Sequence, residues 1–157
     1  MDRMVNMRYE DRFTEGAKNV LNIAFSAAAE LGHSYVGSEH ILLGFAREGG
    51  GVAAKTLKNH GLSFEKILNL IETNVGKGAS GQEPNQGLTP RAKRIIERGV
   101  AEAARLGHNY VGTEHLLMGM LREYDCLGAR MISSTGIDLN RVYTDVLTSF
   151  GNEPGNQ

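Results

Sequence analysis

The chain has 157 residues, of which 41% are hydrophobic and 22% are charged, as in an ordinary globular protein of one domain or two small modules. Its 17 basic and 18 acidic side chains give a formal net charge of -1, without the basic excess expected of a protein that binds nucleic acid or an anionic membrane. The single cysteine, Cys126, cannot form an intramolecular disulfide and indicates a reducing compartment. Because the charged N-terminus contains no apolar stretch of signal-peptide length, we expect a cytoplasmic protein without a membrane segment.

One internal repeat organises the chain. Residues 31–48 recur as residues 106–123 with 12 of 18 positions identical. The same alignment, which we call the repeat alignment, extends without a gap in both directions and pairs Phe13 with Leu88. Self-similarity at a fixed offset indicates a duplication, so one structural unit is expected to occur twice.

Segments rich in Gly, Asn and Pro flank the two units, and this composition is typical of flexible connections. The predicted order is an N-terminal extension, a first unit, a flexible linker, a second unit and the start of an inter-domain linker, at residues 1–12, 13–76, 77–87, 88–151 and 152–157. A unit of about 64 residues is marginal alone, because small domains bury too little surface. We therefore expect the two units to pack together with pseudo-twofold symmetry.

Each unit is predicted to begin with a long amphipathic helix. Thr14 and Thr89 are suited to cap these helices, since a threonine hydroxyl accepts a hydrogen bond from an unpaired N–H of the first turn. Pro90 then occupies the first helical position, where its missing N–H does no harm. Apolar residues follow with helical spacing. Gly32 and Gly107 are predicted to end the helices in the left-handed conformation.

Three shorter helices are predicted to follow in each unit. The second and fourth helices are predicted to be capped by Ser38 and Ser63 in the first unit and by Thr113 and Asp138 in the second. The third helices are predicted over residues 52–59 and 127–134. No long segment alternates with the period of a strand, so we predict an all-α fold of eight helices, arranged as two four-helix units.

The duplicated segment has the pattern Gly-His-x-Tyr-Val-Gly-[Ser/Thr]-Glu-His-[Ile/Leu]-Leu, followed by Gly and Arg-Glu. The units open with Phe-Thr-Glu-x-Ala-Lys from Phe13 and Leu-Thr-Pro-Arg-Ala-Lys from Leu88. Together these strings resemble the Clp N-terminal repeat over residues 13–151, and the pattern is closest to the ClpC branch of the AAA+ unfoldases.

This resemblance implies a substrate- and adaptor-recognition domain mounted on an ATPase ring that feeds a partner peptidase. Adaptor proteins and unfolded or phosphoarginine-marked proteins are the implied partners. The resemblance assigns phosphoarginine binding to Glu39 and Glu114, with Thr14 and Thr89 as secondary participants. The chain itself has no Gly-x-x-x-x-Gly-Lys-[Ser/Thr] string, so we expect neither ATP hydrolysis nor a cofactor.

The chemistry of phosphoarginine fits these residue types. Its guanidinium group pairs with a carboxylate, and its phosphate is bound by hydroxyls and by the N–H groups of a helix N-terminus. Both are available in the candidate set Ser38, Glu39, Thr89, Thr113, Glu114 and Thr14. Two other interpretations remain open: the glutamates only stabilise their helix dipoles, or the domain docks adaptors without a small-ligand site.

The histidines offer an alternative of another class, a small metal-dependent hydrolase. His33, Glu39 and His40 recur as His108, Glu114 and His115, two sets of nitrogen and oxygen ligands. However, the spacing is not His-Glu-x-x-His, so the two histidines would not share one helical face. We therefore predict a structural role around the turn and no metal site.

One surface is predicted to differ between the units. Residues 47–54 read Arg-Glu-Gly-Gly-Gly-Val-Ala-Ala, whereas residues 122–129 read Arg-Glu-Tyr-Asp-Cys-Leu-Gly-Ala. Bulkier side chains thus replace a glycine-rich turn, and Cys126 is predicted to be a small packing residue. We expect adaptor preference near the second unit to differ accordingly. Several basic residues are predicted to form solvated helix faces, among them Arg91, Arg94, Arg98 and Arg105.

Overall fold

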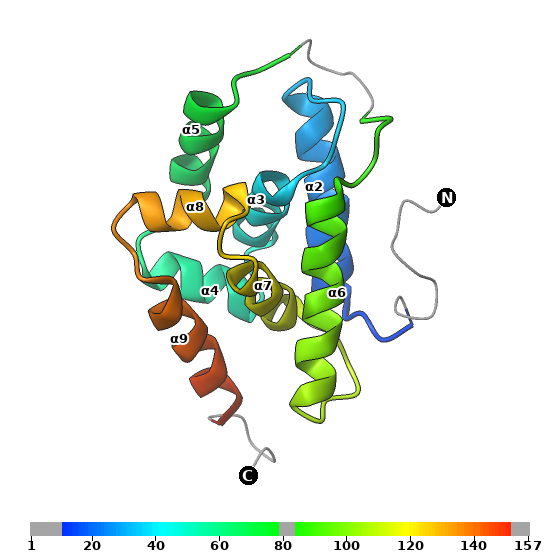
Figure 1. Ribbon diagram of the computed structural model, residues 1–157, viewed down its shortest axis with the longest axis vertical. Helices are drawn as coiled ribbons and strands as arrows, with labels where there is room; N and C mark the ends of the chain where they lie inside the picture. Colours follow the sequence, from blue (N-terminus) through cyan, green and yellow to red (C-terminus); the bar gives the residue numbers. More distant parts are fainter. Residues whose placement is uncertain (1–10, 79–83, 152–157) are drawn as a thin grey trace.

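The computed structural model describes residues 11–78 and 84–151, which form eight helices (Figure 1). They are α2 (Glu15–Glu30), α3 (Ser38–Glu48), α4 (Val52–Asn59), α5 (Phe64–Asn74), α6 (Pro90–Arg105), α7 (Thr113–Arg122), α8 (Leu127–Ser134) and α9 (Leu139–Gly151). Strand pairing in the described ranges is limited to two isolated bridges. The all-α class is therefore confirmed. Residues 1–10 of the predicted extension, 79–83 of the linker and 152–157 of the inter-domain linker lie outside the described residues.

The long helices α2 and α6 begin and end as their sequences predict. The hydroxyls of Thr14 and Thr89 accept the backbone N–H three residues later, at 3.1 and 3.0 Å. At the opposite ends, Gly32 and Gly107 have φ angles of 74° and 78°, in the left-handed region that favours glycine. The predicted third helices also agree with the observed α4 and α8.

The predicted caps of α3 and α7 are wrong. The N-cap residues are Gly37 and Gly112, and Ser38 and Thr113 are already helical. The N–H of each cap glycine donates to the imidazole three residues later, at 2.9 Å in both repeats. The serine and threonine hydroxyls are thereby left for contacts with other helices.

Glycines let the first two helices of each repeat pack closely. A Cβ on Gly44 of α3 would lie 2.5 Å from the carbonyl oxygen of Val20 in α2. A Cβ on Gly119 of α7 would collide in the same way with the carbonyl oxygen of Ile95 in α6. Since real side chains do not approach a backbone oxygen this closely, both crossings require glycine.

The two repeats share one hydrophobic core instead of packing as separate bundles. Helix α3 contacts α8, and the equivalent pair α7 and α4 is also in contact. Figure 1 shows α3 and α7 in the centre, with α2 and α6 along one side. The chain segments before α2 and α6 each form a parallel bridge with the other repeat, Phe13 with Val111 and Leu88 with Val36. In this pseudo-twofold arrangement, each repeat therefore contains a chain segment that pairs with the other repeat. Within the described ranges, no helix has the length and apolar character needed to cross a membrane.

Candidate functional site

The N-terminal ends of α3, α6 and α8 meet at one place, which we name the first junction. Val36 N–H donates to the Gly87 carbonyl at 2.8 Å, and Thr89 N–H donates to the Val36 carbonyl at 3.0 Å. The Ser38 hydroxyl accepts the N–H of Gly128 at 2.8 Å, which fixes the first turn of α8 against α3. A pocket of about 290 Å³ opens between these helix ends, and its lining includes Tyr35, Glu39, Thr89, Arg91 and Cys126.

The N-terminal ends of α7, α2 and α4 meet in the same way at the second junction. Thr14 N–H donates to the Val111 carbonyl at 3.0 Å, and Val111 N–H donates to the Arg12 carbonyl at 2.8 Å. The Thr113 hydroxyl accepts the N–H of Ala53 at 3.3 Å. In the repeat alignment, each contact is the counterpart of one at the first junction. Both junctions are therefore composite: the threonine of one repeat lies beside the Ser/Thr-Glu pair of the other.

A buried glutamate lies at the centre of each junction. Glu39 is 4% exposed and Glu114 is 8% exposed. Each carboxylate folds back over its cap glycine, because a Cβ on Gly37 or Gly112 would lie 2.6 or 2.5 Å from its Oε1 atom. A larger residue at this position would displace the carboxylate from the cap, although the extended backbone itself would accept it.

Glu39 is a buried carboxylate with one neutral side-chain partner. The Tyr35 hydroxyl donates to its Oε2 atom at 3.1 Å. Burial and the charge of Glu39 raise the pKa of Tyr35 to about 12, so this hydroxyl remains a donor. Among residues 11–78 and 84–151, no lysine or arginine forms an ion pair with Glu39. A carboxylate withdrawn from water in this way gains stability from a cationic ligand.

The histidines of the first repeat form a hydrogen-bond relay. The Gly37 N–H donates to His40 Nδ1 at 2.9 Å. This bond assigns the His40 proton to Nε2, which lies 2.7 Å from His33 Nδ1 and donates to it. The remaining nitrogen, His33 Nε2, then donates to the Gly76 carbonyl at 2.8 Å. The relay fastens the end of α5 to the start of α3.

The second repeat has the same pair, with His115 Nε2 at 2.9 Å from His108 Nδ1. Burial and the neighbouring histidine lower the pKa of His40 to about 3 and that of His115 to about 4. Both rings are therefore neutral at ordinary pH, and their nitrogens are engaged in hydrogen bonds. No set of three His, Cys, Asp or Glu side chains in the described ranges is arranged to hold a metal ion. The geometry fits the predicted structural role.

The two junctions differ at their rims. At the first junction, Arg91 Nη1 lies 2.7 Å from Asp125 Oδ1, so a guanidinium group borders the pocket. Gly16 occupies the position of Arg91 in the other repeat. At the second junction, Glu48 Oε1 instead accepts the N–H of Gly51 at 2.9 Å, at the start of α4. The first junction therefore has a guanidinium group, paired with a carboxylate, at its rim, whereas the second has a carboxylate over one of its N–H donors.

Cys126 belongs to the first junction as a packing and capping residue. It is 2% exposed, and its sulfur accepts the N–H of Ala129 at 3.4 Å at the start of α8. Burial raises the pKa of its thiol, so the thiol is protonated. This agrees with the packing role predicted from the sequence.

The structure brings the six predicted site residues together as two sets of three, each with residues of both repeats. Thr89 joins Ser38 and Glu39, whereas Thr14 joins Thr113 and Glu114. Sequence alone could not establish this, since the repeat alignment does not tell which copy of the threonine faces which glutamate. The contribution of Tyr35 and of the α8 N-terminus was not predicted, although Tyr35 lies only four residues before Glu39, in the loop that leads into α3.

Comparison with known proteins gives consistent matches. The family model for the Clp repeat N-terminal domain matches residues 12–135 and 100–157. The chain is 48% identical over 147 residues to the negative regulator of genetic competence ClpC/MecB of Bacillus subtilis, covering 92% of this chain and 18% of that protein. It is 44% identical to the chloroplastic chaperone protein ClpC1 of Oryza sativa, covering 90% of this chain and 15% of that protein.

Solved structures share the fold. The N-terminal domain of ClpD from Arabidopsis thaliana superposes with a TM-score of 0.75 at 22% identity, covering 90% of this chain and 96% of that one. The N-domain of ClpV from Vibrio cholerae superposes with a TM-score of 0.73 at 15% identity, covering 98% and 92%. The chain spans less than a fifth of the two curated relatives above and nearly the whole of these isolated domains. It belongs to the Clp repeat N-terminal domain family, as a non-catalytic domain.

Proposed function

We propose that this chain is the N-terminal recognition domain of a cytoplasmic, ClpC-type ATP-dependent unfoldase, and that its two junctions bind phosphoarginine on marked protein substrates. The observation that carries the proposal is the buried Glu39 carboxylate, without an ion pair among the described residues, beside three converging helix N-termini. The relatives named above carry this domain in proteins more than five times its length. Adaptor proteins would use the same domain, and the unfoldase ring and its peptidase would act on what the domain captures.

The two ends of phosphoarginine match the two halves of a junction. The guanidinium end would pair with the Glu39 carboxylate, since planar N–H donors and carboxylate oxygens form parallel hydrogen bonds. The phosphate end would lie over the helix N-termini, where N–H groups and helix dipoles favour an anion. At the first junction, Arg91 and the Thr89 hydroxyl border the same pocket and would contact the phosphate.

The two junctions should bind with unequal strength. Arg91 adds a guanidinium group at the first junction, partly offset by the Asp125 carboxylate that pairs with it, while glycines stand in both places at the second. The Glu48 carboxylate at the second junction, which accepts the N–H groups of Gly50 and Gly51, would repel a phosphate. We therefore expect the Glu39 site to be the tighter of the two.

Isothermal titration of free phosphoarginine into the purified domain tests the proposal. The matched variant is Glu39→Gln plus Glu114→Gln, which keeps side-chain volume and removes both charges. We expect it to weaken binding at each site by about tenfold or more, because a charge-assisted hydrogen bond is lost in a buried position. Glu65→Gln plus Glu97→Gln removes the same charge from exposed positions outside the junctions and should leave binding unchanged.

Failure of the wild-type domain to bind phosphoarginine, or equal binding by the Glu39→Gln plus Glu114→Gln variant, would overturn the site assignment. In that case the alternative is a domain that docks adaptors without a small-ligand site. Co-purification of an adaptor that persists in the double variant would favour this alternative.

A further inference from the structure

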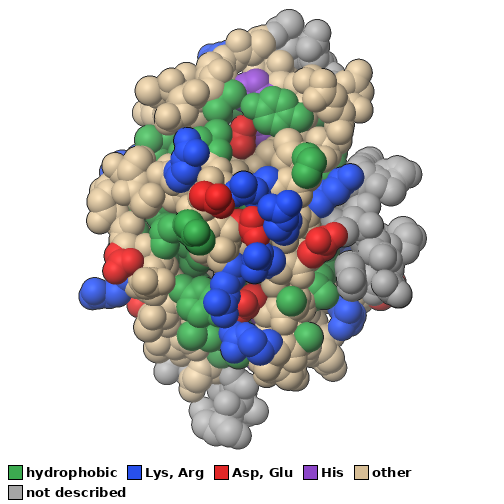
Figure 2. All heavy atoms as spheres, in the orientation of Figure 1, with side chains coloured by type: hydrophobic (Ala, Val, Ile, Leu, Met, Phe, Trp, Pro, Cys, Tyr) green, Lys and Arg blue, Asp and Glu red, His purple; other side chains and the backbone are tan. Residues whose placement is uncertain are grey.

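A row of arginine side chains crosses the face formed by α6 and α7. Figure 2 shows Lys and Arg side chains clustered down the middle of this face, with hydrophobic side chains beside them. The side chains of Arg94 and Arg98 are 51% and 48% exposed, and those of Arg105 and Arg122 are 51% and 46% exposed. Their charged groups are therefore accessible, and we name these four residues the arginine row.

Two buried glutamates hold the row in place. The side chain of Glu123, 5% exposed, contacts Arg94 at 3.4 Å and also Arg98. The side chain of Glu102, 8% exposed, contacts Arg105 and Arg122 at 2.8 Å each. Since each guanidinium has five N–H donors, contact with one carboxylate leaves donors facing the solvent. The guanidinium groups are thus held in position while some of their N–H donors remain available to a partner.

Three of the four arginines of the row are specific to the second repeat, whereas Arg122 corresponds to Arg47. In the repeat alignment, the counterparts of Arg94, Arg98 and Arg105 are Asn19, Ile23 and Glu30. Glu102 likewise corresponds to Ala27. Because α2 and α6 have the same length and the same packing partners, the fold does not require these charges.

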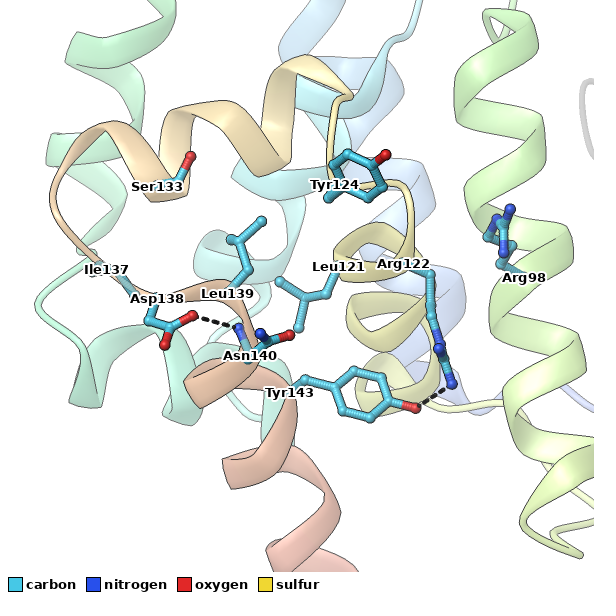
Figure 3. Close-up of a pocket in the computed structure, with 10 residues that line it drawn as sticks. All are labelled: Arg98, Leu121, Arg122, Tyr124, Ser133, Ile137, Asp138, Leu139, Asn140 and Tyr143. Atoms are coloured by element: carbon cyan, nitrogen blue, oxygen red, sulfur yellow. Dashed lines mark hydrogen bonds between the residues drawn. The ribbon is translucent and has the colours of Figure 1, made fainter.

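A pocket of about 800 Å³ lies next to the row, between α7, α8 and the start of α9 (Figure 3). Leu121 and Leu139 line it from α7 and α9. Arg98 lines it from α6, and Arg122 from the C-terminal end of α7. Tyr124 at its edge is 70% exposed, the one large hydrophobic side chain so exposed in the described ranges. The counterpart of Tyr124 in the first repeat is Gly49, so the aromatic side chain is also specific to this face.

We propose that this surface docks an acidic protein segment that carries an apolar anchor residue. The carboxylates of the segment would pair with the outward N–H groups of the arginine row, and the anchor would enter the pocket beside Tyr124 and Leu139. Charge complementarity selects an acidic partner. The leucine and tyrosine side chains that line the pocket, among polar ones such as Asn140, favour a protein segment with an apolar anchor over a nucleic acid. Exposed arginine and tyrosine are also the side chains that contribute most to binding at protein interfaces.

This docking surface is distinct from the phosphoarginine sites. Neither Glu39 nor Glu114 lines the pocket beside the arginine row. The Glu39→Gln plus Glu114→Gln variant should therefore retain docking, and failure of one proposal leaves the other standing. Arg91 is left unchanged in every variant of the docking test, because it borders the first junction as well.

The test uses fluorescence anisotropy with a short labelled peptide in which Asp and Glu surround a central Leu-Phe pair. We expect Arg94→Gln plus Arg98→Gln to weaken binding by about tenfold or more, since two charge-assisted contacts are removed. Tyr124→Ser, at an exposed position, should weaken binding several-fold. Added salt should weaken binding by the wild-type domain, because the contacts are electrostatic and partly exposed.

Matched controls separate docking from general charge attraction and from misfolding. Lys55→Gln plus Lys66→Gln removes two exposed charges from the first repeat and should bind the peptide as the wild type does. Arg94→Lys plus Arg98→Lys keeps the charge near Glu123 and should bind more tightly than the glutamine variant. A peptide with Ser-Ser in place of Leu-Phe should bind more weakly. The proposal is overturned if the wild type does not bind the peptide, if Tyr124→Ser and the Ser-Ser peptide bind as well as their parents, or if a single-stranded RNA binds more tightly than the peptide.

Discussion

Acidification from about pH 7.5 to about pH 5 should weaken the folded domain through the two histidine relays. Burial and the neighbouring histidine lower the pKa of His40 from 6.5 to about 3 and that of His115 from 6.5 to about 4. The unfolded chain binds protons on both rings as the pH falls below about 6.5, whereas the folded chain does not. Stability from these groups is therefore complete above that pH and is lost as the pH falls toward the folded pKa values.

The magnitude follows from the pKa difference. Each pH unit below about 6.5 costs about 1.4 kcal/mol per histidine, which gives about 2 kcal/mol for each ring at pH 5 and about 4 kcal/mol for both. This is a large part of the roughly 5–15 kcal/mol by which domains are stable. Glu102 affects the stability at lower pH. Burial by itself would raise the pKa of its carboxyl group, but hydrogen bonds from Tyr143 and two arginines lower that pKa below 4.5. Its contribution is lost only below that pH.

Guanidinium chloride unfolding, followed by circular dichroism at both pH values, measures the effect. The variant His40→Asn plus His115→Asn should lose most of the pH dependence, and its stability at neutral pH should fall because two relays are broken. Equal free energies of unfolding for the wild type at both pH values, or an unchanged pH dependence in the double variant, would refute the reasoning.

Three further stability predictions follow from particular contacts, each measured by the same unfolding experiment. Gly44→Ala should destabilise the domain by about 2 kcal/mol, because its Cβ would meet the Val20 carbonyl, whereas Gly50→Ala should change stability little. Glu123→Gln should cost about 2 kcal/mol, since a nearly buried carboxylate loses its charge beside arginines. Thr89→Ala should cost about 1 kcal/mol through the loss of the α6 cap, and no loss would contradict the observed capping bond.

Much of the fold could be predicted because the signals are local. A threonine cap and a closing glycine bound each of the long helices, and the predicted third helices coincide with α4 and α8. The duplication then required the two units to be alike. Ser38 and Thr113 were misassigned as caps because their residue types favour that role, while the hydroxyls are in fact bonded to α8 and α4 of the other repeat. A contact between the two repeats cannot be recognised from the residue type at a single position.

The residues of the candidate site could be predicted from the sequence, but the contacts between them could not. Glu39 and Glu114 were recognised from the duplicated motif, yet their burial over a cap glycine depends on the folded backbone. The arginines of α6 were predicted to form a solvated face. These side chains are about half exposed, and the structure adds that Glu123 and Glu102 hold them in a row, although most of these ion pairs join residues far apart in the sequence.

The central claim is that each phosphoarginine site is built from both repeats. Titration of phosphoarginine into isotopically labelled domain, followed by amide chemical shifts in NMR spectra, tests it most directly. The account predicts that Thr89 shifts together with residues 37–39, and that Thr14 shifts together with residues 112–114. Arg91→Gly, which copies the second junction at that position, should weaken the first set alone. Shifts that pair Thr14 with residues 37–39, or that fall outside both junctions, would contradict the account.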